Sequence, residues 1–376
     1  MRRSTAGALP GSPLPCGTDF LVGHSAADAD QETDWKVGPT QFLNGLVRKM
    51  TSALQSKRIC VTGGAGFLGR RVCDRLRSAC TTDVFVPRSA EYDLTDARAT
   101  DAMLQASRPD VLIHLAAEVG GIGANRVNPG RFFFANMSMG LNVIEAARRR
   151  GIAKLVLVGT VCAYPKHCPV PFQEDDLWSG YPEETNAPYG VAKRALGTML
   201  DAYHRQYGLN GVYLLPVNLY GPGDNFDLES SHVIAALIRK CCDAVERGAD
   251  EVACWGSGAV SREFLYVDDA ADGIVRAAAL HNDPAPVNLG SGREIRIAEL
   301  AAMIAELCGF RGRLVWDREQ PDGQPRRCLD TRRAESLLGW KAMTDLEAGL
   351  RRTIDWWRAE RGKAHAVGAV ASSASG

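Results

Sequence analysis

One short segment constrains the fold of this chain more than any other. An apolar run at 58–62 leads into a loop with glycines at 63, 66 and 69, and apolar residues at helical spacing follow from Phe67 to Leu76. The three glycines permit a tight turn, the close approach of a pyrophosphate, and the close packing of helix against strand. The start of the helix offers free N–H groups to phosphate. The segment therefore predicts a strand–turn–helix unit that binds a dinucleotide.

Short apolar strands alternate with helices from residue 57 to about 218. Further strands are expected near 83–86, 111–115, 154–158 and 211–215, and helices near 97–107, 131–150 and 188–207. Strands that alternate with helices pair in parallel and are covered on both faces. The pattern predicts an α/β fold with a doubly wound parallel sheet of the Rossmann type.

The alternation loosens after about Asn218, which predicts a second, smaller α/β lobe that binds the substrate. Its expected elements are helices near 231–247 and 297–308 and strands near 252–255 and 313–316. The segment 262–289 returns to strand–helix–strand order and is expected to rejoin the main sheet. The predicted division is therefore 57–218 plus about 262–290 for the dinucleotide-binding domain, and 219–261 plus about 291–360 for the lobe.

The two ends of the chain lack clear periodicity. Residues 1–56 are rich in small and polar residues and are predicted to be a flexible extension, with a short helix near 41–54. The Ala/Ser/Gly-rich stretch 361–376 is predicted to be disordered.

The overall composition argues against several classes of protein. Lys+Arg and Asp+Glu are both 44, so no net charge favours nucleic acid or an anionic membrane surface as partner. The 11 Cys are scattered and odd in number, which indicates reduced thiols rather than a disulfide framework or a zinc site. No apolar run approaches the roughly 18 residues of a membrane span, and no signal peptide is recognisable. We expect a cytoplasmic protein without a bound metal.

A Tyr-x-x-x-Lys pair suggests where the chemistry takes place. Tyr189 and Lys193 fall on one face of the helix expected at 188–207, so both side chains reach one site. A nearby ammonium favours the phenolate and lowers the pKa of a tyrosine from its usual value of about 10. Such a pair is common by chance. The pair becomes more indicative of catalysis together with Thr160, which follows the strand expected at 154–158 and carries a hydroxyl group.

Glycine loop, Thr160, Tyr189 and Lys193 in this order resemble the extended short-chain dehydrogenase/reductase family. In that family the hydroxyl and the tyrosine hold a 4-oxo or 4-hydroxyl group of the substrate, and the tyrosine transfers the proton. The dehydratases of the family carry two acids after the threonine. Here Val161 and Cys162 stand in their place, which disfavours dehydration.

Longer stretches resemble the GDP-L-fucose synthase branch of that family over nearly all of 57–358. They lie at 119–122, 162–166, 184–189, 218–226, 231–234, 255–258, 262–264 and 321–327. The resemblance implies that Cys162 is the base and His232 the acid for epimerisation at carbons 3 and 5 of a GDP-4-keto-6-deoxy-hexose. It implies that Tyr189 protonates the 4-oxygen during reduction, with Thr160 and Lys193 assisting. It also implies a homodimer formed by the helices near 131–150 and 188–207.

The same resemblance implies the remaining binding residues. Lys240, Trp255, Arg262 and Asp322 match positions that hold the GDP-sugar, and the two cations suit a diphosphate. The expected cofactor contacts are Gly63, Gly64, Ala65, Gly66, Phe67, Leu68, Gly69, Arg88, Asp93, Leu94, Leu115, Ala116, Val158, Gly159, Thr160, Val161, Lys193, Pro216, Val217, Asn218, Leu219 and His232.

The second strand is followed by Arg88 rather than by an acid, which favours NADP(H) over NAD(H), because an arginine can pair with a 2′-phosphate. The alternative is that Arg88 is an ordinary surface residue and Glu91 binds the ribose.

Several alternatives stay open at this point. A free Cys is usually a small buried apolar residue, a single His is usually structural, and Trp255 suits core packing as well as stacking on a ligand. Relatives that act on GDP-keto-heptoses or on colitose precursors would keep most of the same residues. An epimerase that recycles its cofactor, or a non-catalytic NADP-sensing protein of the same fold, are the other hypotheses.

Overall fold

The computed structural model describes residues 39–79 and 83–373, and for 39–44, 46–47 and 363–373 it describes the backbone alone. The chain divides into the units Met1–Leu43 and Asn44–Gly376. Residues 1–38 of the predicted flexible extension lie outside the described residues. At its end, helix α1 (Pro39–Leu54) coincides with the helix expected near 41–54. All further features belong to the unit 44–376.

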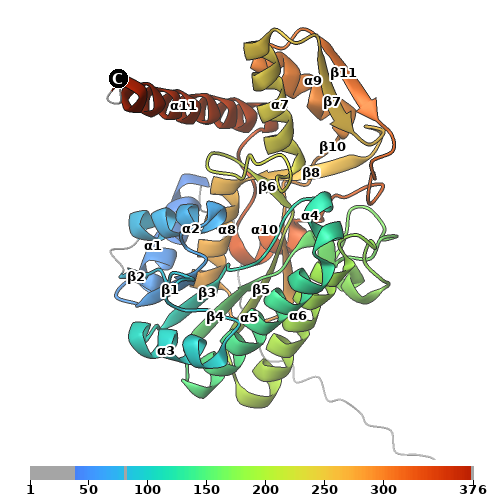
Figure 1. Cartoon of the computed structure of the whole chain (residues 1–376). Helices are drawn as coiled ribbons and strands as arrows, with labels where there is room; N and C mark the ends of the chain where they lie inside the picture. Colours follow the sequence, from blue (N-terminus) through green and yellow to red (C-terminus); the bar gives the residue numbers. More distant parts are fainter. Residues whose placement is uncertain (1–38, 80–82, 374–376) are drawn as a thin grey trace, which may run out of the picture. The chain divides into compact units, whose positions relative to one another are not determined.

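Six parallel strands form the central sheet, in the order β2-β1-β3-β4-β5-β9 (Figure 1). They are β1 (Ile59–Thr62), β2 (Val84–Phe85), β3 (Val111–His114), β4 (Lys154–Val158), β5 (Gly211–Pro216) and β9 (Pro286–Leu289). Four of them, β1 and β3–β5, are buried along their whole length, as expected of strands covered on both faces. The predicted doubly wound parallel sheet is confirmed.

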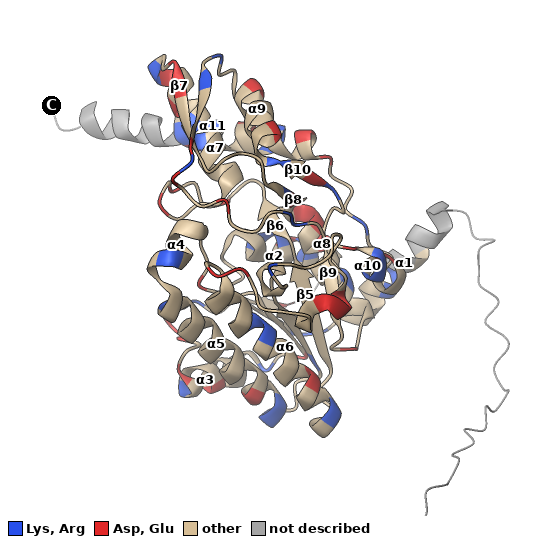
Figure 2. Ribbon diagram, turned by 90° about the vertical axis from the view of Figure 1, so that its right-hand side faces the viewer, with Lys and Arg blue, Asp and Glu red and all other residues tan. Residues whose placement is uncertain are grey.

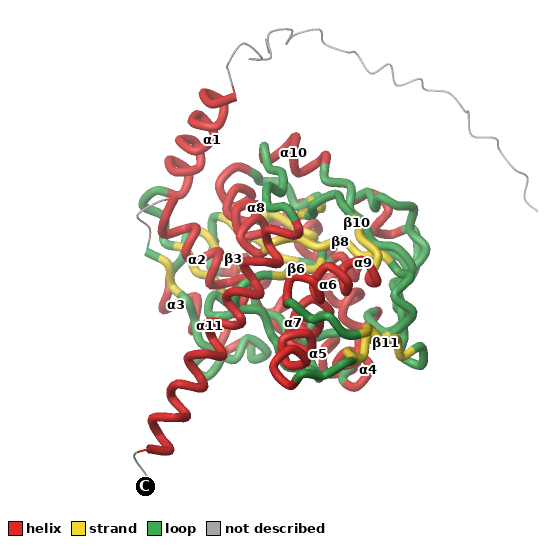
Figure 3. The backbone as a smooth tube through the Cα atoms, turned by 90° about the horizontal axis from the view of Figure 1, so that it is seen from above, coloured by secondary structure: helices red, strands yellow, loops and turns green. Residues whose placement is uncertain are grey.

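Helices cover both faces of this sheet. On one face α2 (Phe67–Ala79) packs against α8 (Val267–Leu280), which contacts β4 and β5 and is seen over the strands in Figure 3. On the other face α3 (Ala97–Ser107), α5 (Pro129–Arg149) and α6 (Ala187–Tyr207) follow one another. The apolar residues of these elements form one continuous core, which also takes in Met50 and Leu54 of α1.

The smaller lobe has its own sheets and its own core. β6 (Asn218–Tyr220), β8 (Ser261–Tyr266) and β10 (Glu294–Arg296) form one sheet, and β7 (Glu251–Trp255) pairs with β11 (Arg313–Asp317). The helices α7 (Val233–Arg247) and α9 (Ile297–Cys308) pack together against these strands. Their buried side chains form a second cluster, separate from that of the main sheet.

The segment 262–289 divides between the two sheets. Strand β9 and helix α8 join the main sheet as expected, but β8 does not, because it pairs with β6 and β10 instead. Both neighbours of β8 lie in the smaller sheet, and the edge of the main sheet beside β5 is taken by β9. β8 therefore leads from one sheet to the other through the buried start of α8.

Five short or terminal helices complete the described part of the chain. They are α4 (Ile122–Val127), the 3₁₀ turns η1 (Val161–Ala163) and η2 (Glu174–Trp178), α10 (Arg332–Leu338) and α11 (Leu346–Ser373). Helix α11 continues to Ser373, where we expected disorder from 361 onward. Residues 361–373 contain four alanines and no proline. Alanine is the strongest helix former, so the backbone can stay helical there.

Candidate active site

A cavity of about 960 Å³ opens at the carboxyl ends of β1, β3, β4 and β5 and continues into the smaller lobe. Ligands of open α/β sheets bind at this edge. Every site residue predicted from the sequence lines the cavity, with the exception of Gly64. A Cβ on Gly64 would meet the carbonyl oxygen of Val61 at 2.8 Å and the side chain of Val86 at 2.9 Å, so this glycine serves the packing of the turn.

The glycine loop is shaped by its own backbone. Gly63 has a φ of +72°, and a Cβ there would lie 2.7 Å from the amide nitrogen of Ala116. A Cβ on Gly69, in the first turn of α2, would lie 2.0 Å from the carbonyl oxygen of Gly63. No other residue type fits either position without moving the backbone. The loop thus leaves a cradle of N–H groups at the start of α2, which fits a pyrophosphate.

Beyond this loop, Arg88 and Asp93 line the far end of the cavity. Arg88 is exposed, and among the described residues no carboxylate lies within ion-pair distance of it. Asp93 accepts hydrogen bonds from Thr95 Oγ1 and the Thr95 N–H, and these bonds lower the pKa of its carboxyl group. Glu91, the alternative ribose ligand, is not among the residues that line the cavity. A free guanidinium at this end suits a 2′-phosphate.

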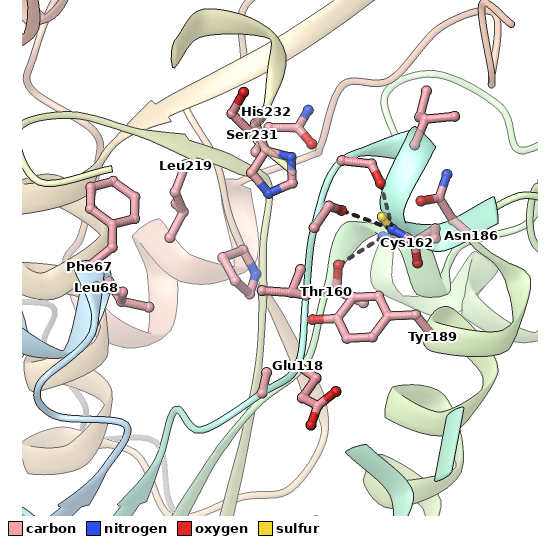
Figure 4. Close-up of a pocket in the computed structure, with 18 of the residues that line it drawn as sticks. Phe67, Leu68, Glu118, Thr160, Cys162, Asn186, Tyr189, Leu219, Ser231 and His232 are labelled. Atoms are coloured by element: carbon pink, nitrogen blue, oxygen red, sulfur yellow. Dashed lines mark hydrogen bonds between the residues drawn. The ribbon is translucent and has the colours of Figure 1, made fainter. Parts of the chain in front are cut away.

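Thr160 and Tyr189 lie close together in the cavity (Figure 4), and Lys193 lines the same cavity. Thr160 follows β4, and its Oγ1 accepts a hydrogen bond of 3.2 Å from the N–H of Cys162, which caps η1. Lys193 is buried, and its Nζ donates to the carbonyl oxygen of Val158 over 3.1 Å. The helix α6 holds Tyr189 one turn before Lys193, so all three side chains are fixed by the same strand and helix.

Burial decides the protonation of this group. Desolvation raises the pKa of Tyr189 above its usual value, and a hydrogen bond with Thr160 offsets part of that rise. Desolvation also lowers the pKa of Lys193 to about 8. The phenol therefore carries its proton at neutral pH, while the lysine is close to losing its own.

Cys162 and His232 line the same cavity from different elements. Cys162 is half-buried in η1 and lies beside Tyr189, whereas His232 is the exposed N-cap residue of α7 and faces the cavity from the other lobe (Figure 4). The surrounding protein lowers the pKa of His232 by desolvation, and the charge of Arg327 lowers it further. The imidazole is therefore neutral at neutral pH.

The smaller lobe contributes cations and an aromatic ring. Arg262 is buried and donates to the carbonyl oxygens of Ser261 and Asp322 over 2.7 and 2.8 Å; burial and then Arg327 lower its pKa to about 9. Lys240 Nζ lies 5.8 Å from the centroid of the Trp255 ring. Trp255 is 51% exposed, which rules out the alternative of core packing for this side chain.

Asp322 uses its carboxylate and its carbonyl oxygen for hydrogen bonds within the smaller lobe. Its carboxylate accepts 2.7 Å hydrogen bonds from the N–H and the hydroxyl of Ser257. Its carbonyl oxygen holds Arg262. Asp322 therefore orders the wall that carries Arg262.

The sequence analysis assigned no role to several residues of the cavity. Asn186 is buried, and its Nδ2 donates to Glu183 Oε2 over 2.8 Å. Gln324 and Arg327 are also buried. Arg327 Nη1 lies 3.6 Å from Sγ of Cys162, which belongs to η1. All three fall inside stretches that carry the resemblance to GDP-L-fucose synthases. The available signal was the position of Arg327 in a stretch that has no helical or strand periodicity.

In the parts of the chain that the structure describes, no three His, Cys, Asp or Glu side chains are grouped so as to hold a metal ion. Within the same residues, no helix has the length and apolarity needed to cross a membrane.

The geometry of the site agrees with comparisons to known proteins. Residues 59–290 match the model of the NAD dependent epimerase/dehydratase family. The chain belongs to this family.

Within the epimerase/dehydratase family, the relatives of this chain handle nucleotide sugars. The chain is 42% identical over 301 residues to a protein described as probable GDP-L-fucose synthase 1 of Oryza sativa subsp. japonica. The match covers 80% of this chain and 92% of that protein. A crystal structure of a GDP-L-fucose synthetase from Naegleria fowleri bound to NADP is similar, with a TM-score of 0.73 and 27% identity, over 81% of this chain and 94% of that one. A GDP-6-OMe-4-keto-L-xylo-heptose reductase from C. jejuni is also similar, with a TM-score of 0.76 and 26% identity, over 81% and 98%.

Proposed function

We propose that this chain is an enzyme that epimerises GDP-4-keto-6-deoxy-D-mannose at carbons 3 and 5 and then reduces carbon 4, giving GDP-L-fucose. One observation carries the proposal: Cys162 and His232 line the same cavity as Thr160, Tyr189 and Lys193. A reductase alone needs only the latter three. A thiol and an imidazole in the same cavity add two groups that can act as general base and general acid.

The epimerisation step uses protons next to the 4-keto group. A proton alpha to a ketone is acidic once the carbonyl oxygen accepts hydrogen bonds, and Thr160 and Tyr189 are placed to donate them. Cys162 then removes the proton from one face, and His232 returns a proton from the other. The two residues come from different elements, η1 and the start of α7, as proton transfer on opposite faces of a sugar ring requires.

The reduction step uses the protonated phenol of Tyr189. Bound NADPH would supply the hydride for carbon 4. Because burial raises the pKa of Tyr189, the phenol holds a proton that it can give to the 4-oxygen. Lys193 lies one turn along α6, and its ammonium stabilises the tyrosinate that remains.

The rest of the cavity suits a GDP-sugar and NADP(H). Arg262 and Lys240 provide positive charge for the diphosphate, and Trp255 offers an exposed ring for a flat or apolar ligand surface. Arg88 provides the charge for the 2′-phosphate that distinguishes NADP(H). The similarity to a structure bound to NADP supports the same cofactor.

The decisive experiment follows both steps at once. The enzyme is incubated with GDP-4-keto-6-deoxy-mannose in heavy water, first without and then with NADPH. We expect deuterium at carbons 3 and 5 before reduction, and then one NADPH consumed per product. Absence of deuterium at either carbon would remove the epimerase step. Deuterium without net NADPH consumption would instead support an epimerase that recycles its cofactor.

A second candidate substrate is a GDP-4-keto-heptose. The similarity to a GDP-6-OMe-4-keto-L-xylo-heptose reductase favours it, although the overall identity to that protein is lower than to the rice relative. The two are distinguished by kcat/KM for NADPH oxidation with each ketone. A value at least tenfold higher for the heptose would overturn the fucose assignment.

A homodimer in the cytoplasm completes the proposal. Helices α5 and α6 pack side by side on the outer face of the main sheet (Figure 2). Between residues 132 and 144, α5 carries no charge, and Phe133, Phe134 and Leu141 are exposed there. A second copy would cover this strip. Sedimentation at micromolar concentration tests the dimer, and a monomer would contradict it.

A further inference from the structure

Arg327 is a buried cation without an anionic partner. Its side chain is 6% exposed and lines the cavity. Within the described residues no carboxylate lies in ion-pair distance of its guanidinium. A buried charge is costly unless something compensates it. The position therefore needs an anion that is present for at least part of the reaction.

The neutral acceptors around Arg327 fix its direction. Its Nε donates to Gln324 Oε1 over 3.2 Å, and its Nη1 lies 3.4 Å from Asn218 Oδ1 and 3.6 Å from Cys162 Sγ. The thiol is the one of these three partners that can become an anion. The guanidinium is thus aimed at the proposed base of the epimerisation.

Two of these partners, Gln324 and Cys162, are themselves held by further hydrogen bonds. Gln324 is buried, and its Nε2 donates to the carbonyl oxygens of Pro165 and Lys166 over 2.9 and 3.0 Å, on the segment that follows η1. Cys162 is held on its other side by the hydrogen bond of its N–H to Thr160 Oγ1. The loop of the smaller lobe and the end of β4 together set the separation of guanidinium and sulfur.

We propose that Arg327 is a positioning residue for Cys162, whose guanidinium holds the sulfur toward the sugar and stabilises it as a thiolate. The proposal rests on the function proposed above. In the step concerned the thiolate takes a proton from carbon 3 or 5: the C–H bond breaks, an S–H bond forms, and the electron pair moves to the 4-oxygen as an enolate. A cation beside the sulfur favours the thiolate, which is the form that acts as a base.

The other titratable groups around the sulfur do not replace Arg327. Tyr189 of α6 is neutral because burial raises its pKa, and the pKa of His232 at the start of α7 is lowered by desolvation of its ring and by the charge of Arg327. Arg262 of β8 is charged, but its Nη atoms donate to the carbonyl oxygens of Ser261 and Asp322. Arg327 is therefore the cation in hydrogen-bonding contact with the thiol.

The first test needs no substrate. The rate at which iodoacetamide alkylates Cys162 is measured by peptide mass spectrometry as a function of pH. In Arg327→Gln we expect the midpoint of this profile to move up by about one pH unit, because one opposite charge within 4–6 Å shifts a titration by that order. Arg327→Lys keeps the charge and should recover at least half of the shift. The matched control is Arg276→Gln, which removes a half-buried arginine of α8 that does not line the cavity and should leave the profile unchanged.

The second test measures the proposed chemistry. Exchange of deuterium into carbons 3 and 5 should fall at least tenfold in kcat in Arg327→Gln at pH 7, with the dissociation constant of NADPH unchanged. A rise in KM alone, with an unmoved alkylation profile, would show that Arg327 binds an anionic part of the substrate, and would overturn the proposal. If the wild-type enzyme shows no exchange, the proposed function fails, while the alkylation profile still decides the contact between Arg327 and Cys162.

A variant that keeps Arg327 covers the case in which Arg327→Gln does not fold. Gln324→Leu removes the anchor of the guanidinium but not its charge. We expect the alkylation midpoint to rise by a smaller amount, about half a unit on the same scale. An unchanged midpoint in a folded Gln324→Leu protein would contradict the role of the anchored guanidinium.

Discussion

The two halves of the cavity are built in different ways. The cofactor half lies at the ends of β1, β3, β4 and β5, and its shape comes from backbone: glycines that exclude side chains and N–H groups at the start of α2. The substrate half comes from α7, β7, β8 and the loop 321–327, and its shape comes from side chains. Those side chains are held by hydrogen bonds to carbonyl oxygens: Arg262 donates to two of them and Lys240 to one.

This difference has a consequence for specificity. The sheet can hold the same dinucleotide in many enzymes, because little besides glycine is required there. The smaller lobe can exchange one side chain for another without changing the fold, so it is where related GDP-sugars are told apart. Changes in the first half should therefore abolish function, whereas changes in the second half, apart from those at His232 and Arg327, should retune it.

The largest expected loss of activity is that of Tyr189→Phe, on α6 beside the main sheet. Loss of the hydroxyl removes the proton donor for the 4-oxygen, and general acid catalysis contributes about 10²–10⁴ in rate. We expect kcat for NADPH oxidation to fall about 10³-fold. Cys162→Ser serves as the counterpart, and should slow deuterium exchange at carbons 3 and 5 more than hydride transfer. Equal losses in both variants and both assays would mean that the two steps do not use separate groups.

Next in size is Gly69→Ala, which tests the backbone character of the cofactor half. A Cβ would meet the carbonyl oxygen of Gly63 at 2.0 Å, so loop or helix has to move. We expect a loss of about 2–3 kcal/mol in the free energy of unfolding, as for other overpacked sites, and NADPH binding weakened beyond detection. The control is Gly130→Ala in the first turn of α5, where a Cβ meets nothing within 4 Å. Normal NADPH affinity in Gly69→Ala would show that the loop adapts.

The same contrast explains what the sequence could predict. The parallel sheet and the glycine loop follow from local patterns, since each strand, turn and helix is continuous in the chain. The pairing of β8 with β6 and β10 did not follow, because a short apolar strand carries no mark of which sheet it joins. The family resemblance supplied Cys162 and His232, but not the contact between Cys162 and Arg327. The two are 165 positions apart, and their contact depends on how Gln324 reaches Pro165.

A smaller effect is expected when the pH is raised: kcat/KM for reduction should fall by about tenfold. Burial lowers the pKa of Lys193 to about 8, so the ammonium loses its proton as the pH rises through that value. The charge that stabilises the tyrosinate of Tyr189 then disappears, and kcat/KM for reduction should fall by about tenfold between pH 8 and 9.5. Lys193→Arg keeps a charge over this range, so whatever its absolute rate, its profile should lack this limb. A wild-type profile that is flat to pH 9.5 would contradict the assignment.

The smallest effect belongs to the substrate half. Trp255 is 51% exposed, so Trp255→Ala should change stability by less than about 0.5 kcal/mol. Loss of an aromatic stacking surface should raise KM for the GDP-sugar about tenfold with kcat nearly unchanged, since stacking on a base is worth about 1–3 kcal/mol. Trp178→Ala is the matched control: its ring is 63% exposed and also carries a cation, Arg194, 4.9 Å from its centroid, but it does not line the cavity. If both variants raise KM alike, the effect is not stacking. If Trp255→Ala lowers kcat instead, the ring contributes to the chemistry as His232 and Arg327 of the same half are proposed to do, and the assignment of Trp255 to recognition alone fails.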